Sequence, residues 1–203
     1  MGSTTYKTNC GYCGSEASTS GSACSPEHGD AVTNISTGAY YVAVPNFGNG
    51  ESCGLCVSIT YGSKTIVATV VDNCATCGQG HIDLNPAAGA ALGMGNGMTE
   101  DATVDVSWKP VACPVSNGIA VVYNGVYSGQ LYFQNVAFPV KSASAVIFGQ
   151  TRPATLTNGM WVFSEGVPEG AEITLTDIAG HTVKGLMPGT NGGSLGVQFP
   201  TGC

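Results

Sequence analysis

The cysteines of this chain are crowded into its first half. Eight of the nine lie between Cys10 and Cys113, and the ninth, Cys203, is the last residue. Cytosolic proteins seldom keep so many cysteines unless they bind metal, whereas secreted proteins use them in disulfides. The first 113 residues are therefore expected to form a unit stapled by disulfides. The chain is expected to be secreted into an oxidising, extracellular space.

Two Cys-x-x-Cys pairs leave a second interpretation open. The spacing of Cys53 and Cys56, followed by Cys74 and Cys77, fits a four-cysteine zinc ribbon. Against this, Cys56 lies inside an alternating strand pattern rather than on a turn, and the other five cysteines would stay unexplained. Disulfides are the preferred prediction, and no metal site or cofactor is predicted.

Charge and hydropathy exclude two classes of partner. Only 9% of the residues are charged, with six Lys and Arg in total and a net charge of −7. A surface that follows a phosphate backbone needs clustered basic side chains, so nucleic acid is excluded. The uncharged stretch between Lys109 and Lys141 is broken by Pro, Asn, Gly and Gln, so no apolar span of about 20 residues crosses a membrane.

The first half of the chain carries strand patterns. Residues 55–61 alternate between apolar and polar, a Gly-Ser turn follows, and residues 64–71 are rich in β-branched side chains. Residues 39–44 and 103–108 have similar patterns. One helix is predicted over residues 86–92, because Asn85 can cap it and proline suits the first helical position.

The second half is predicted to be strands throughout, separated by Gly, Pro and Asn turns. The predicted strands are residues 118–123, 129–136, 143–148, 160–163, 172–178, 182–186 and 195–199. So many short strands in such a segment predict a β-sandwich, for which an immunoglobulin-like arrangement is the first choice. Residues 113–116 resemble a short linker, which predicts two domains, 1–113 and 117–203.

Two acids stand out in the polar segment 71–86. Asp72 ends a β-branched strand, and Asp83 directly precedes the predicted helix. Acids at the ends of elements joined by one loop can converge on a cleft, where a close pair has separated pKa values and one carboxyl can donate a proton. The structural alternative is that Asp83 caps the helix and Asp72 holds a turn.

Several motifs follow one another along the chain. Residues 50–56 have the pattern G-x-S-C-G-x-C, His81-Ile82-Asp83-Leu84 is close to an H-F-D-L motif, and residues 106–113 combine a strand with a closing cysteine. In this order they resemble the first domain of the expansin family. Residues 135–140 and 175–180 resemble the second domain of microbial members. The resemblance implies a mainly β protein, a six-stranded double-psi β-barrel followed by an immunoglobulin-like β-sandwich of the family 63 carbohydrate-binding modules.

The resemblance also implies cysteine pairs. These are Cys24 with Cys53 and Cys56 with Cys113. The partners of the remaining cysteines stay open, with a local bridge between Cys74 and Cys77 as one option.

A set of groove residues follows from the same resemblance. Asp83 matches the aspartate that wall loosening requires, and Asp72 matches a second acid in the groove. Thr5 and Tyr6 resemble the N-terminal strand whose threonine hydrogen-bonds toward the aspartate, and His81 flanks the site. Cys74 stands where microbial members have a groove tyrosine, so one sugar-contacting ring is missing.

Three aromatic residues of the second half are predicted to bind polysaccharide. By resemblance, Tyr127 and Trp161 fall at or near aromatic positions of the microbial binding face, although Ser128 replaces one tryptophan. Tyr132 is expected to point outward if Leu131 is core. Flat sugar faces stack on such rings. The alternative for each is core packing.

The resemblance implies a secreted, monomeric protein that binds cell-wall polysaccharide such as cellulose and loosens it without hydrolysis. The family 45 endoglucanases of the same barrel need two carboxylates, and their base follows a T-x-Y element. Here Thr4-Thr5-Tyr6 is followed by Lys7-Thr8, without an acid. The alternatives are a weak glycoside hydrolase or lytic transglycosylase with Asp83 as acid, and a barwin-like defence or inhibitor protein.

Overall fold

A computed structural model gives the fold of the chain. It describes residues 3–7, 24, 40–45, 48–75, 77–94, 103–124, 129–189 and 191–201, with the backbone alone for 3–7 and 103. Tyr127, Cys10, Cys13 and Cys203 lie outside the described residues, as do the side chains of Thr5 and Tyr6. Among the described residues, no helix is long and apolar enough to cross a membrane.

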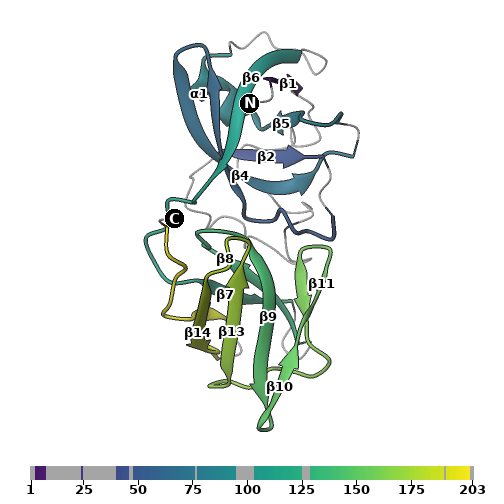
Figure 1. Cartoon of the computed structure of the whole chain (residues 1–203), viewed down its shortest axis with the longest axis vertical. Helices are drawn as coiled ribbons and strands as arrows, with labels where there is room; N and C mark the ends of the chain where they lie inside the picture. Colours follow the sequence, from purple (N-terminus) through teal and green to yellow (C-terminus); the bar gives the residue numbers. More distant parts are fainter. Residues whose placement is uncertain are drawn as a thin grey trace.

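The N-terminal half, the upper part of Figure 1, forms a closed barrel. Its strand order is β1-β5-β2-β4-β3-β6. The strands are β1 (Ser3–Lys7), β2 (Tyr41–Val44), β3 (Cys56–Tyr61), β4 (Lys64–Asn73), β5 (Ile82–Leu84) and β6 (Thr103–Val111). β1 pairs with β5 and β2 with β4 in parallel, and the other neighbours are antiparallel. The core side chains include Val42, Ile59, Val70, Ile82 and Leu84.

The predicted helix is confirmed as α1 (Pro86–Leu92). Asn85 caps it, because its Oδ1 accepts a hydrogen bond from the amide of Ala88 at 3.1 Å. The same Oδ1 accepts from the amide of Tyr41 in β2 at 3.2 Å. Gly93 ends the helix at φ 81°, a left-handed conformation that favours glycine. One side chain thus joins the start of α1 to the neighbouring strand.

Three disulfides lie among the described cysteines of the barrel. They join Cys24 to Cys53, Cys56 to Cys113 and Cys74 to Cys77. The first two are the pairs that the resemblance implied, and the third is the local bridge. Because Cys53 and Cys56 belong to two different disulfides, the four-cysteine zinc ribbon is wrong.

The C-terminal half consists of two antiparallel sheets. One has the order β10-β9-β13-β14 and the other β11-β12-β8-β7-β15. Their strands are β7 (Ala120–Tyr123), β8 (Gln130–Gln134), β9 (Val140–Ile147), β10 (Gln150–Pro153), β11 (Thr155–Thr157), β12 (Met160–Val162), β13 (Glu172–Asp177), β14 (Thr182–Leu186) and β15 (Gly193–Ser194). Side chains of both sheets form one core, including Val121, Leu131, Ile147, Trp161, Ile173 and Leu175.

The prediction and the structure differ at four strands of this half. The short β15 was not expected, and neither were β10 and β11, because polar edge strands lack apolar alternation and β10 ends in a proline. Residues 195–199 form no regular strand, although Leu195 and Phe199 are buried. The apolar pattern there reflects burial in the core instead of strand pairing.

The two halves lie end to end along the long axis of the molecule (Figure 1). Backbone hydrogen bonds join them where they meet. The amide of Cys113 donates to the carbonyl of Ala137 at 2.8 Å, and the amide of Gly159 donates to the carbonyl of Asn49 at 2.7 Å. A small pocket lies at this junction, with Gly54 on the barrel side and Tyr132 on the sheet side among its lining residues.

Candidate functional site

The two predicted acids lie on one face of the barrel wall. In the strand register, Ala43 of β2 pairs with Asp72 of β4 on one side and with Asp83 of β5 on the other. Paired residues on neighbouring strands project from the same face of a sheet, and the Cα atoms of second neighbours are roughly 10 Å apart. The register therefore forms an acidic row, defined as Asp72, Ala43 and Asp83.

A β-bulge brings Asp72 into this row. Val42 pairs with Val70, but the next residue, Ala43, pairs with Asp72, so Val71 is an extra residue in β4. Without it, Val71 would stand opposite Ala43. Bulges redirect side chains in this way and are common beside functional sites. A period-2 sequence pattern contains no signal for the extra residue.

The acidic row lies on the outer side of the barrel wall. Ile82 and Leu84 belong to the barrel core, so Asp83, which stands between them, projects from the opposite face. Asp83 is nevertheless only 6% exposed, whereas Asp72 is partly exposed. The Oδ1 of Asp72 accepts a hydrogen bond from the backbone amide of Asn73 at 2.7 Å. One acid of the row is thus partly exposed and the other is buried.

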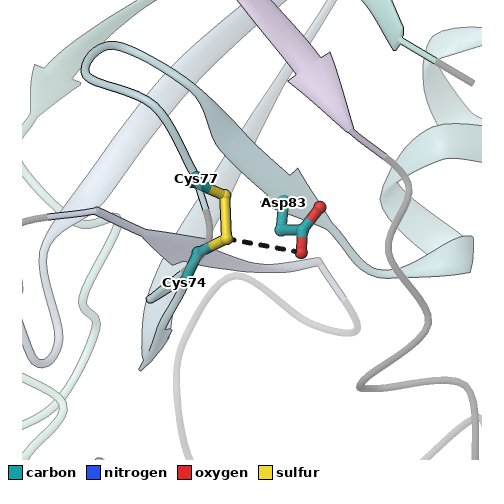
Figure 2. Close-up of side chains that lie close together, drawn as sticks. All are labelled: Cys74, Cys77 and Asp83. Carbon is teal, nitrogen blue, oxygen red and sulfur yellow. Dashed lines mark hydrogen bonds between the residues drawn. A yellow bond between two sulfur atoms is a disulfide. The ribbon is translucent and has the colours of Figure 1, made fainter. Parts of the chain in front are cut away.

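The Cys74–Cys77 disulfide lies against Asp83 (Figure 2). The Sγ of Cys74 is 3.7 Å from Oδ2 of Asp83. A disulfide sulfur carries no hydrogen, so in the oxidised protein this approach is a packing contact rather than a donated hydrogen bond. Cys74 stands where the resemblance placed a sugar-contacting tyrosine in other members. In this chain the position carries a disulfide that packs against the carboxylate of Asp83.

Tyr41 is a site residue that the sequence reasoning missed. It stands two residues before Ala43 in β2, so its side chain projects from the same face, roughly 7 Å along the strand. The ring is partly exposed, and burial raises the pKa of the phenol above its usual value. Tyr41 therefore stays neutral beside the acidic row. The signal was its period-2 relation to Ala43.

Several hydrogen bonds of the described residues hold the loop before β5. The indole Nε1 of Trp108 in β6 donates to the carbonyl of Gly80 at 3.0 Å. The amide of His81 donates to the carbonyl of Gly78 at 3.0 Å, and the ring of His81 lies over Gly78. The described contacts of His81 close the turn, and its role beside the site stays a prediction. Trp108 was not singled out from the sequence.

The N-terminal strand supplies the far edge of the site. Its backbone register pairs Lys7 with Asp83 and Tyr6 with Ile82. Lys7, and not Thr5, is thus the residue directly opposite Asp83. This strand carries no acid, as its sequence shows.

Two of the predicted aromatic residues are buried. Trp161 is 6% exposed and packs in the core of the two sheets, with its ring centroid 6.5 Å from that of Phe133. Tyr132 is 7% exposed. The expectation that both present an open binding face is wrong, because Trp161 faces the shared core and Tyr132 faces the junction with the barrel. Tyr127, outside the described residues, stays a prediction.

Comparison with known proteins places this geometry in context. No family model matches the chain. The papain inhibitor of Streptomyces mobaraensis is 33% identical over 104 residues, which cover 48% of this chain and 67% of that protein. The apo expansin of Clavibacter michiganensis superposes with a TM-score of 0.76 and 22% identity, covering 99% of this chain and 98% of that one.

A mutant of that expansin in complex with cellohexaose is similar to the same extent. Its TM-score is 0.75 at 22% identity, with the same coverage of 99% and 98%. Since the match spans nearly the whole of both chains, it includes the barrel and both sheets. The chain therefore has the fold of a microbial expansin, and it belongs to the family of the Streptomyces mobaraensis papain inhibitor.

Proposed function

We propose that this protein is secreted, binds a cell-wall polysaccharide of the cellulose type and loosens it without hydrolysis. The observation that carries the proposal is the acidic row with Tyr41 beside it on one face of the barrel. A glucan chain can bind to such a surface, because its sugar rings stack on an aromatic ring and its hydroxyls donate hydrogen bonds to carboxylates. The expansin of similar fold that was solved with cellohexaose supports the same ligand class.

The finer architecture belongs to this proposal. We propose a double-psi topology for the barrel, an immunoglobulin-like arrangement for the two sheets, and separate domains at residues 1–113 and 117–203. Separate hydrophobic cores in the two halves support the division. Three disulfides suit an oxidising compartment and therefore secretion. We expect a monomer.

The partly exposed Asp72 and the ring of Tyr41 make the first contact with the sugar chain. Charge-assisted hydrogen bonds are about twice as strong as neutral ones, so Asp72 holds hydroxyls firmly. Asp83 lies deeper, beside the disulfide, and is reached only when the sugar chain seats fully. Binding then favours a glucan conformation that differs from the packed one, and a chain separates from its neighbours without a covalent step.

Hydrolysis fits the site less well. An inverting pair must flank the scissile bond, one carboxyl at the leaving oxygen and the other on the opposite face of the sugar ring. Asp72 and Asp83 project from one wall in the same direction, with Ala43 between them. The strand that pairs with β5 on its other side, β1, has no acid to act as the base.

Measuring the release of sugars distinguishes wall loosening without hydrolysis from hydrolase or lytic transglycosylase activity. We expect the wild type to weaken filter paper or extend heat-inactivated walls, while reducing ends from phosphoric-acid-swollen cellulose and fragments from peptidoglycan stay at background. Steady release that is lost in Asp83→Asn would establish a hydrolase or lytic transglycosylase instead. Glu172→Gln is the matched control, since Glu172 is an exposed acid of β13 in the C-terminal half, away from the barrel.

A second candidate function rests on the Streptomyces relative. At 33% identity over two thirds of its length, the papain inhibitor favours the inhibitor alternative for part of this chain. Titration of papain with the purified protein tests it directly. We expect no inhibition. Stoichiometric inhibition that persists in Asp83→Asn and Tyr41→Ala would show that the protein is a protease inhibitor and that the acidic row is not its functional site.

A further inference from the structure

The corner at the end of β4 brings together three potential metal ligands. Both Sγ atoms of Cys74 and Cys77 and a carboxylate oxygen of Asp83 lie within 4.8 Å of one another (Figure 2). Cys74 and Asp83 are buried and Cys77 is partly buried. In the structure the two sulfurs are joined, which holds the site in its oxidised form. The groups themselves are those of a soft cation site.

The spacing and the donor set select the class of ion. Two cysteines separated by two residues are a common zinc-binding element, and a carboxylate is a regular third ligand. In tetrahedral coordination the ligand atoms stand about 3.5–3.8 Å apart, so the three atoms need only small side-chain rotations once the disulfide opens. Thiolates favour zinc-like ions over magnesium or calcium.

The backbone around the corner is already fixed. The amide of Cys74 donates to the carbonyl of Val44 at 3.0 Å, and the amide of Cys77 donates to the carbonyl of Cys74 at 3.2 Å. Asp83 is held within β5 by pairing with β2. The backbone at Cys74, Cys77 and Asp83 is therefore held by hydrogen bonds in addition to the sulfur–sulfur bond. The two other described disulfides leave Cys53 and Cys56 unable to join them.

We propose that reduction of the Cys74–Cys77 disulfide converts this corner into a site for one thiophilic divalent cation, with Cys74, Cys77 and Asp83 as ligands. A dithiol reductant supplies two electrons and two protons to the sulfur–sulfur bond and becomes a cyclic disulfide itself. The two thiols release their protons when the cation binds. Three protein ligands leave a fourth position for water or another small donor.

Cation binding also engages the carboxylate of Asp83. This consequence rests on the proposed function, because a ligated Asp83 is withdrawn from polysaccharide. The cation site itself does not rest on it. Binding is measured with metal alone on the reduced protein, whereas wall loosening is measured on the oxidised protein, so the two can fail separately.

Cobalt substitution tests the site. The full chain is treated with a limited amount of dithiol, the opened cysteines are identified by alkylation and mass spectrometry, and Co²⁺ is added without oxygen. We expect one Co²⁺ per chain, with a thiolate-to-cobalt charge-transfer band and the visible bands of a tetrahedral site. Zn²⁺ should displace the cobalt and remove both signals.

Three controls decide the assignment. The oxidised wild type and the reduced Cys74→Ser/Cys77→Ser variant should show no charge-transfer band. Both controls retain the cysteines of the other two described disulfides, so a band from those cysteines would appear in the reduced variant as well. Asp83→Asn should weaken Zn²⁺ binding by at least roughly 10–100-fold, which is the loss of affinity when a group that only hydrogen-bonds a metal ligand is mutated. An absent band in the reduced wild type, a band in either control, or unchanged affinity in Asp83→Asn overturns the proposal.

Discussion

At the scale of single residues, burial separates the roles of the two acids. Asp72 is partly exposed, whereas Asp83 is buried beside a disulfide. Sequence spacing suggested only that the two acids converge. Their unequal access is a property of the folded wall, and it predicts unequal effects of mutation.

Asp83→Asn is expected to abolish wall creep or paper weakening while changing binding to insoluble cellulose by less than about twofold. Asparagine is nearly isosteric but removes the charge that accepts strong hydrogen bonds. Creep assays and binding isotherms check the two parts. Glu172→Gln should leave both at wild-type levels. Loss of binding together with creep would mean that Asp83 is a primary contact and not a deep one.

Tyr41→Ala is expected to weaken glucan binding by about 2–10-fold, because a stacked aromatic ring contributes about 0.5–1.5 kcal/mol. Tyr41→Phe keeps the ring and should bind almost as the wild type does. Since burial raises the pKa of Tyr41, the phenol is protonated at neutral pH, and its contribution should not change with pH there. Equal losses in the two variants would assign the effect to the hydroxyl.

Trp161→Ala is expected to lower the free energy of unfolding and not to act on polysaccharide binding directly. Because the side chain fills the shared core of the two sheets, truncation should cost about 3–5 kcal/mol of unfolding free energy. Chemical denaturation measures this loss. A variant that unfolds at the wild-type midpoint but releases cellulose would restore Trp161 to a binding face.

At the scale of elements, the site depends on the contact between β2, β5 and α1. The Oδ1 of Asn85 serves both the first turn of α1 and the amide of Tyr41. The bulge in β4 sets Asp72 against Ala43 from the other side. The acidic row is thus held by a capping side chain at one end and a bulge at the other.

Asn85→Ala should cost about 1–2 kcal/mol, because it removes a helix cap and leaves a strand amide without its partner. Asn85→Asp keeps the acceptor and should recover most of the loss. Equilibrium denaturation gives the free energies, and creep assays show whether the row is disturbed. If Asn85→Ala and Asn85→Asp were equally destabilised, the cap would not be what stabilises this corner.

At the scale of the whole molecule, two glycines allow the barrel to touch the C-terminal sheets. Gly50 has φ +92°, and a Cβ there would collide with the backbone of Gly159. The neighbouring hydrogen bond from Gly159 to the carbonyl of Asn49 closes the same contact. The junction buries Tyr132, together with Gln134, whose amide has no hydrogen-bond partner among the described residues.

Gly50→Ala is expected to open this junction. Its matched control is Gly62→Ala, since Gly62 also has a positive φ, of +58°, but nothing lies within 4 Å of its Cβ position. A left-handed alanine costs about 1–2 kcal/mol in either variant. Gly50→Ala should lose more than that and show a larger radius of gyration in solution scattering. Equal behaviour of the two variants would show that the contact is not closed in solution.

The sequence by itself determined the local elements of this protein. The β-branched strand of residues 64–71, the cap at Asn85 and the helix that follows need only periodicity and backbone chemistry, and each is found. The motif order also pointed to the expansin fold that the structural comparison shows. Local rules suffice there because neighbouring residues alone decide the outcome.

Only the tertiary structure decided what surrounds the functional side chains. The bulge at Val71 depends on pairing with β2, and the burial of Tyr132 depends on a barrel loop far away in sequence. Tyr132 does point away from the core of its own sheets, as its alternation predicts. A second surface covers it, because exposure is a sum over all neighbours in space, and period-2 alternation within one strand carries no information about the other half of the chain.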